Sequence, residues 1–196
     1  MSSYASTTLP FVLAAHRAPG ALAALDDQLD AAIVCAVGRR ASTAQGRALL
    51  GIWERSFASV APAEAVAVLR PYAALLRASG TGSAAAGAGE APPLVSAHLG
   101  PLFGAVAALV GLTLQQAAYV FMLGHVKALV SAAVRASMFG PYQAQKVLAS
   151  PEVQAMINCA IEREWDTPVE EAAQTVPVMD LWIGRHELLY SRIFNS

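Results

Sequence analysis

The sequence predicts an all-α fold, a single-domain helical bundle arranged around one long central apolar helix. Apolar residues recur at helical spacing along most of the chain, whereas the alternation typical of β-strands does not stand out anywhere. The length of 196 residues suits one domain with a sizeable core. Because only 14% of the residues are charged and the net charge is -1, the chain has no basic excess and we expect no nucleic-acid partner.

The long central helix is expected between Thr113 and Pro141. Thr113 and Gln116 have the spacing of a capping box, and Gly140-Pro141 is a stop signal. A helix that is apolar nearly all round is expected to be buried. Its few polar or small positions share one narrow arc: Gly124, Lys127, Ser131 and Arg135. This arc is either the solvated edge of a core helix or a polar seam that faces a partner or an internal passage.

Two helices are expected in the first forty residues. The first spans 6–16 and is limited by Pro10, and the second spans 21–37 and ends at Gly38. In the second helix, apolar residues mark one face and acidic residues the other: Leu22, Leu25, Leu29, Ile33 and Val37 against Asp26, Asp27 and Asp30.

Two more helices precede a low-complexity segment. Ser42 or Thr43 is the expected N-cap of a helix that reaches Phe57. The next helix spans 62–77 and is expected to kink or divide at Pro71. The Ser-, Gly-, Ala- and Pro-rich run 79–93 is predicted to be a flexible linker.

The second half of the chain is expected to hold four helices and a tail. Helices are predicted over 99–110, over the long segment already described, over 141–149, and from Pro151 to about 163 behind a Ser150 N-cap. Residues 164–177 are acidic and broken by proline, so a loop is expected there. The aromatic segment 178–196 is interpreted either as docking on the core of its own chain or as an anchor for another protein.

The sequence offers no catalytic grouping. The four histidines lack metal-site spacing, the serines lack a nucleophile elbow, and no phosphate-binding glycine motif occurs. His125 and Cys159 could together bind Ni²⁺ or Zn²⁺, but a core histidine and a buried thiol are the favoured interpretation. We therefore expect no enzyme, no metal site and no cofactor of the chain's own.

A membrane-associated helical protein is the alternative interpretation. No charged residue occurs from Ala91 to Val126, which is long enough to span a bilayer. Proline and glycine pairs divide this run, however, and Lys127 and Arg135 follow within the same helix. The opening MSSYASTTLP lacks the features of a signal peptide, and the two cysteines form no C-x-x-C pair, so a cytoplasmic location without a membrane is expected.

Two stretches resemble the urease accessory protein UreF family. SAAVRASMFGPYQAQKVL (131–148) is similar to the central S-A-A-V-R segment of that family, and LYSRIFNS (189–196) is similar to its terminal R-L-F-x-S signature. PLFGAVAALVGLTLQQAAYVF and SSYASTTLPFVLAAHR also fit, and the resemblance is strongest to fungal-type members. It implies an all-α, dimer-forming chaperone component of the cytoplasm.

The resemblance also implies partners and partner-binding residues. Family members assemble with a UreD/UreH-type scaffold and a UreG-type GTPase and help to deliver nickel to apo-urease. GTP belongs to the GTPase and nickel to the complex, so no nickel site is carried over. Arg135, Gly140, Pro141 and Gln145 match the central motif, and Arg192, Ile193, Phe194 and Ser196 match the tail that engages the UreD/UreH partner.

The family's opening segment has no counterpart in this sequence. UreF proteins begin with a stretch of the form Leu-Pro-x-Gly-x-[FY]-[ST]-x-[ST]-x-G-Leu-Glu, and the present chain begins where the following helices are expected. The resemblance therefore predicts a family member that lacks the N-terminal segment.

Overall fold

Helices make up the architecture in the computed structural model, which describes residues 2–82, 95–174, 178 and 180–188. In chain order they are α1 (Ser2–Arg17), α2 (Leu22–Ala32), α3 (Ala36–Ile52), α4 (Ala63–Gly82), α5 (Leu99–Leu109), α6 (Leu114–Arg135), α7 (Pro141–Ala149), α8 (Pro151–Glu164) and α9 (Asp180–Ile183). Single helical turns occur at η1 (Pro19–Ala21), η2 (Trp53–Phe57), η3 (Val169–Glu171) and η5 (His186–Leu188). The described residues contain no strand, and the all-α, single-domain prediction is confirmed.

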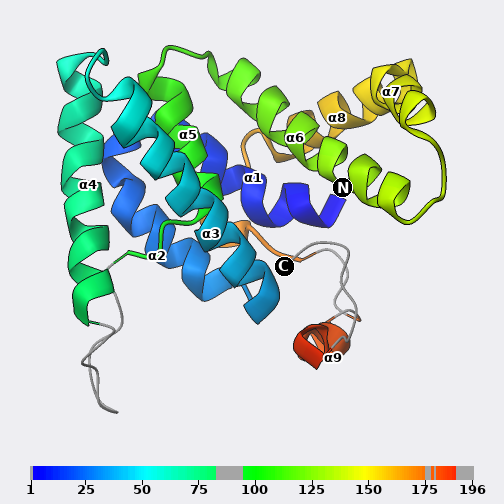
Figure 1. Ribbon diagram of the computed structural model, residues 1–196, viewed down its shortest axis with the longest axis horizontal. Helices are drawn as coiled ribbons and strands as arrows, with labels where there is room; N and C mark the ends of the chain where they lie inside the picture. The colour runs from blue at the N-terminus through cyan, green and yellow to red at the C-terminus, as the bar shows by residue number, and fades with distance from the viewer. Residues whose placement is uncertain (1, 83–94, 175–177, 179, 189–196) are drawn as a thin grey trace.

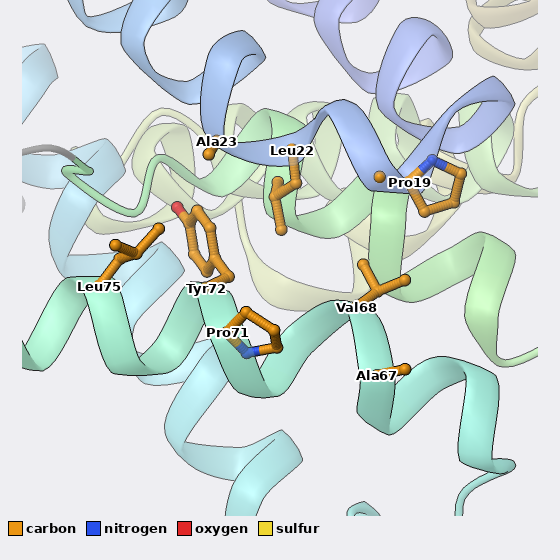
Figure 2. A pocket seen from close by; sticks show the side chains of 9 residues that line it. Pro19, Leu22, Ala23, Ala67, Val68, Pro71, Tyr72 and Leu75 are labelled. Atoms are coloured by element: carbon orange, nitrogen blue, oxygen red, sulfur yellow. The ribbon is translucent and has the colours of Figure 1, made fainter.

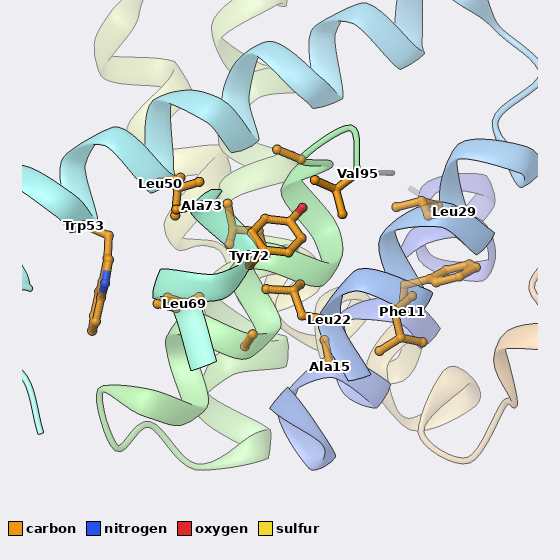
Figure 3. Packing of buried hydrophobic residues seen from close by; sticks show 14 of the residues in the cluster. Phe11, Ala15, Leu22, Leu29, Leu50, Trp53, Leu69, Tyr72, Ala73 and Val95 are labelled. Carbon is orange, nitrogen blue, oxygen red and sulfur yellow. The ribbon is translucent and has the colours of Figure 1, made fainter. Parts of the chain in front are cut away.

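Helix α1 takes part in both hydrophobic cores. The first core joins α1 to α2, α3, α4 and α5, and Figure 3 shows its packing around Phe11, Leu22, Leu50, Leu69 and Tyr72. The second core joins α1 to α6, α7 and α8 through Leu9, Leu13, Met122, Ala144, Ile157 and Ile161. In Figure 1, α4 lies at one end of the long axis and α7 at the other, with α1 between them. Helix α1 therefore supplies fully buried residues to both cores, α5 adds the partly buried Leu99 and Phe103 to the second, and α6 lines only the second.

Helices α1 and α5 approach each other closely because α5 carries glycine at the contact. A Cβ atom on Gly104 would lie 2.2 Å from the carbonyl oxygen of Val12, well inside van der Waals distance. Val12 itself is fully buried. The G-P-L-F-G sequence at the start of α5 thus permits a backbone approach that any larger residue at position 104 would prevent.

One acidic residue of α2 lies in the core, contrary to the expected polar face. Asp26 is fully buried, while Asp27 is exposed as predicted. The Asp26 carboxylate accepts hydrogen bonds from the backbone N–H groups of Ser96, Ala97 and His98, at 2.6, 3.0 and 2.6 Å. These bonds satisfy both its oxygens, which is what permits burial of a carboxylate. They also fix the loop that leads into α5, where Ala97 adopts a positive φ of 65°.

The boundary between α2 and α3 differs from the expected one. Helix α2 ends at Ala32, and α3 begins at Ala36, so Gly38 lies in the first turn of α3 and does not end α2. Cys35 is the N-cap of α3, because its Sγ accepts a hydrogen bond from the Gly38 N–H at 3.4 Å. Ser42 and Thr43 therefore lie inside α3, and the N-cap prediction for them was wrong.

Among the described residues, two prolines lie in helix interiors, beyond the first turn. Pro10 is inside α1, which starts at Ser2, and α4 runs through Pro71 to Gly82. Burial of Pro10 and its neighbours Leu9 and Phe11 offsets the missing backbone hydrogen bond. Residues 79–82 thus complete α4, and the rest of the predicted linker, 83–93, lies outside the described residues.

Helix α6 is shorter and more exposed than expected. It begins with the predicted capping box between Thr113 and Gln116 but ends at Arg135, five residues before Gly140. The stop is a Schellman arrangement in which Ser137 adopts a φ of 59°, and the Met138 N–H donates to the carbonyl oxygen of Ala133 at 3.0 Å. The expectation of a helix enclosed on all sides was wrong, because only one face of α6 is buried.

The remaining helix boundaries agree with the sequence. Helix α5 begins with Pro101 in its first turn, and α7 begins at Pro141. The Ser150 hydroxyl accepts the Val153 N–H at 3.3 Å and caps α8 as predicted. Beyond α8, the acidic segment forms only the single turn η3 within its described residues.

Candidate functional site

The polar arc of α6 faces solvent. Lys127 and Arg135 are exposed, Gly124 is exposed, and Ser131 is partly buried. Val120 lies on the same arc and is 47% exposed. The structure thus places the arc on the outside of the second core, as the interpretation of a solvated helix edge predicts, and that position also leaves it accessible to a partner.

The corner between α6 and α7 exposes the largest apolar side chains of this region. Met138 is 72% and Tyr142 is 87% exposed. Gly140 is the N-cap residue of α7 and Pro141 its first residue, so these two positions set the direction in which α7 leaves the corner. Gln145 is exposed one turn further along, while Ala144 turns inward to the second core.

We call these residues together the α6–α7 surface: Lys127, Ser131, Arg135, Met138, Gly140, Pro141, Tyr142 and Gln145. No aspartate or glutamate occurs from Ala91 to Pro151, whereas Lys127, Arg135 and Lys146 are exposed cations within this part of the chain. The surface therefore combines positive charge with exposed apolar and aromatic groups. Arg, Met and Tyr are residue types that protein interfaces favour.

Sequence reasoning singled out four residues of this corner but missed Met138 and Tyr142. Tyr142 precedes the buried Ala144 by two positions, about 200° around a helix, so the periodicity of the short helix already placed Tyr142 on the outer face. Met138 had no comparable signal, because its exposure depends on the early end of α6.

The described part of the C-terminal segment contacts the start of α3. The Sγ of Cys35 lies 3.3 Å from the Nδ1 of His186, and the Arg40 guanidinium pairs with the Glu187 carboxylate. Two of its apolar side chains take little part, since Trp182 is 62% and Leu188 is 80% exposed. The tail residues Arg192, Ile193, Phe194 and Ser196 lie outside the described residues.

The two cysteines are less buried than expected. Cys159 is exposed and Cys35 is partly buried. The ring of His125 stacks on Tyr4 with centroids 3.9 Å apart, and burial lowers the pKa of His125 to about 4. Within the described ranges, no group of three or more histidine, cysteine or acidic side chains gathers in a way that could hold a metal ion.

A Ser–His–Asp chain of hydrogen bonds does occur in the first core. His98 Nε2 lies 2.8 Å from an Asp30 carboxylate oxygen, and His98 Nδ1 lies 3.1 Å from Ser42 Oγ. His98 is fully buried, and the Ser42 hydroxyl already accepts the Leu99 N–H at 3.3 Å. Because no substrate can reach the buried His98, this histidine cannot act as the general base of a catalytic triad. These hydrogen bonds instead join α2, α3 and the start of α5.

An apolar groove lies at the opposite end of the molecule from the α6–α7 surface. It has a volume of about 270 Å³ and lies between η1 with the start of α2 and the middle of α4, where Figure 2 shows Leu22, Val68, Pro71 and Tyr72 around it. Burial and the nearby Asp26 carboxylate raise the pKa of Tyr72 well above its ordinary value, so its hydroxyl stays protonated. The groove offers no charged group to orient a polar ligand.

Comparison with known proteins points to one family throughout. The family model described as UreF matches residues 1–152. The chain is similar to an uncharacterized urease accessory protein UreF-like of Schizosaccharomyces pombe, at 32% identity over 100% of the chain and 78% of that protein. It is similar to urease accessory protein F of rice (Oryza sativa subsp. indica), at 32% identity over 96% of the chain, and to urease accessory protein F of Arabidopsis thaliana, at 28% identity over 100% of the chain. The chain spans 65% of the length of the rice protein and 74% of the Arabidopsis protein.

Proposed function

The chain belongs to the UreF family of urease accessory proteins, and on that basis we propose that it is an adaptor in urease maturation. In this role it assembles with a UreD/UreH-type scaffold and a UreG-type GTPase to support GTP-dependent nickel insertion into apo-urease. We propose further that it works in the cytoplasm as a homodimer within that complex, and that it binds and positions its partners without catalysing a reaction.

The observation that carries this proposal is the α6–α7 surface. It holds the central motif residues Arg135, Gly140, Pro141 and Gln145 at or next to a corner where Tyr142 is 87% exposed. Exposed aromatic and arginine side chains at such a corner supply the anchors on which protein interfaces depend. The absence of acidic residues from 91 to 151 favours a partner with an acidic surface.

The C-terminal segment supports a second contact. Its described residues touch the chain's own α3 through His186 and Glu187 but leave Trp182 and Leu188 largely exposed. Apolar side chains exposed to this degree near a chain end are available for a partner. The tail residues 192–196 continue this segment and are proposed to contact the UreD/UreH-type scaffold.

Co-purification with the UreD/UreH-type and UreG-type proteins tests the proposal. We expect Tyr142→Ala to weaken capture of the scaffold about thirtyfold, the effect of losing a hot-spot side chain worth ~2 kcal/mol. Arg135→Ala is expected to act in the same direction. The matched control is Arg70→Ala, because Arg70 is an exposed helical arginine on α4, at the other end of the molecule.

Two outcomes would contradict the proposal. Equal capture of wild type, Tyr142→Ala and Arg135→Ala would remove the α6–α7 surface from the interface. Unchanged capture after deletion of 180–196 would show that the tail is not part of the partner interface. Helicity measured by circular dichroism for each variant separates a binding defect from a folding defect, since both substituted side chains are exposed and should leave the helices intact.

A further inference from the structure

Two metal-binding side chains meet where the C-terminal segment touches α3. Cys35 and His186 are 151 residues apart in the sequence, yet Sγ and Nδ1 lie 3.3 Å apart. We propose that Cys35 and His186 form a two-ligand site for a borderline-soft divalent cation, of the class of Zn²⁺ and Ni²⁺, which fastens the C-terminal segment to α3. This proposal is independent of the role in urease maturation.

The separation of the two donor atoms suits one shared cation. With bonds of about 2.3 Å to sulfur and about 2.05 Å to nitrogen, the ligands of a tetrahedral ion lie about 3.6 Å apart. At a right angle, as in a square-planar site, the same bonds place them about 3.1 Å apart. The observed 3.3 Å falls between these values, so a cation fits with only a small adjustment of either side chain.

The surroundings of the sulfur suit a thiolate ligand. Cys35 Sγ accepts a hydrogen bond from the Gly38 N–H at 3.4 Å at the start of α3, and such N–H···S contacts stabilise metal-bound thiolates. The second donor, imidazole nitrogen, is a ligand that Zn²⁺ and Ni²⁺ accept readily. A thiolate and an imidazole together select these cations over Mg²⁺ or Ca²⁺, which prefer oxygen.

The positive charges near Cys35 are compensated. The Arg39 guanidinium pairs with Asp30 at 3.3 Å, and Arg40 pairs with Glu187 beside the proposed ligand. Neither arginine therefore opposes a cation with its full charge. Cys35 and His186 are both only partly buried, and the adjacent Val34 is 68% exposed, so a cation can enter from solvent.

The site is expected to exchange its cation readily. Within the described residues, no third histidine, cysteine or acidic side chain completes the group. Water or ligands from another molecule would fill the other two positions of a tetrahedral ion. The cation would then act as a reversible fastener between the chain end and α3.

Titration of the reduced full-length chain with Co²⁺ tests the site, because Co²⁺ bound to a thiolate gives a charge-transfer absorption band in the near ultraviolet. We expect a band that saturates at one equivalent and is displaced by Zn²⁺ or Ni²⁺. Cys35→Ser should abolish the band, and His186→Ala should weaken Co²⁺ binding at least about tenfold. His186→Cys should restore binding, which a merely structural role for His186 would not.

Cys159→Ser is the matched control, since Cys159 is the other cysteine of the chain and is exposed. A wild-type chain without the band, a band that persists in Cys35→Ser, or a band lost in Cys159→Ser would each overturn the proposal. The 3.3 Å contact would then be an ordinary S–H···N hydrogen bond. Such a result would leave co-purification with the urease accessory partners unaffected, so the two proposals fail separately.

Discussion

The Asp26 carboxylate accepts the backbone N–H of His98 at 2.6 Å, across 72 residues of sequence, and so ties α2 to the start of α5. Two further N–H groups, those of Ser96 and Ala97, point at the same carboxylate. A fully buried side chain thus determines the conformation of the loop that enters α5. The stability of the first core depends on this junction.

Asp26→Ala is expected to lower the free energy of unfolding by about 3–5 kcal/mol, because it leaves three N–H groups, those of Ala97 and His98 buried, without their acceptor. The neighbouring Asp27→Ala is the control, and it should change stability by less than about 0.5 kcal/mol because Asp27 is exposed. Urea denaturation followed by circular dichroism measures both. Equal effects of the two substitutions would show that the Asp26 bonds do not support the fold.

Gly46→Ala is expected to destabilise the fold by about 2 kcal/mol or more, since the added Cβ would lie 2.0 Å from the carbonyl oxygen of Ala97. Gly124→Ala is the matched comparison: it lies within α6 with nothing within 4 Å of the new Cβ, and alanine should stabilise that helix by roughly 0.5–1 kcal/mol. Thermal unfolding distinguishes them, because the two midpoints should move in opposite directions. A Gly46→Ala chain as stable as wild type would contradict the close approach of α3 to the loop before α5.

The free energy of unfolding should decrease as the pH is lowered, and His125 accounts for part of this decrease. Burial lowers the pKa of His125 to about 4 from the ordinary value of 6.5. Between these values the unfolded chain binds a proton that the folded chain does not, so this contribution is complete above pH 6.5 and is lost as the pH falls toward 4. His125→Phe preserves the stack on Tyr4 without the proton, and its free energy of unfolding should decline less between pH 7 and pH 4.5. Parallel declines in the two proteins would show that His125 titrates normally.

Membrane fractionation tests the alternative interpretation that the chain is a membrane-associated helical protein. Among the described helices, Leu114–Arg135 alone is long and apolar enough to cross a bilayer, with a mean hydropathy of 1.6. Its buried residues Phe121, Met122 and Val126 belong to the second core with α1 and α8, so we expect a carbonate wash to release the chain into the supernatant. Recovery in the washed membranes would favour the membrane-associated protein instead.

Local signals in the sequence predicted the parts of the fold that local interactions determine. The capping box at Thr113, the Ser150 cap and the Pro-initiated helices α5, α7 and α8 all lie where their own residues indicate. The break between α2 and α3 was missed because it contains neither glycine nor proline, and Gly38 beyond it was a misleading stop signal.

Long-range contacts account for the other differences. Asp26 and Asp27 are equivalent by composition, and only the position of the loop 96–98 decides that Asp26 is the buried one. The apolar composition of α6 predicted burial, but α1 and α8 cover only one of its faces. Of the candidate site, the motif residues at the α6–α7 corner came from the resemblance to UreF proteins. The contact of Cys35 with His186 depends on how the chain end folds back, which no spacing in the sequence encodes.

The position of α1 has a consequence for synthesis of the protein on the ribosome. Its apolar residues pack against α5, α6 and α8, whose sequences begin about ninety or more residues later. At the usual translation rate, α1 leaves the ribosome on the order of ten seconds before α8. During that interval Leu9 and Leu13 lack the residues of α6 and α8 that help to bury them in the folded chain. These apolar side chains are therefore exposed on the nascent chain, which during synthesis is a natural client for chaperones that bind exposed hydrophobic segments.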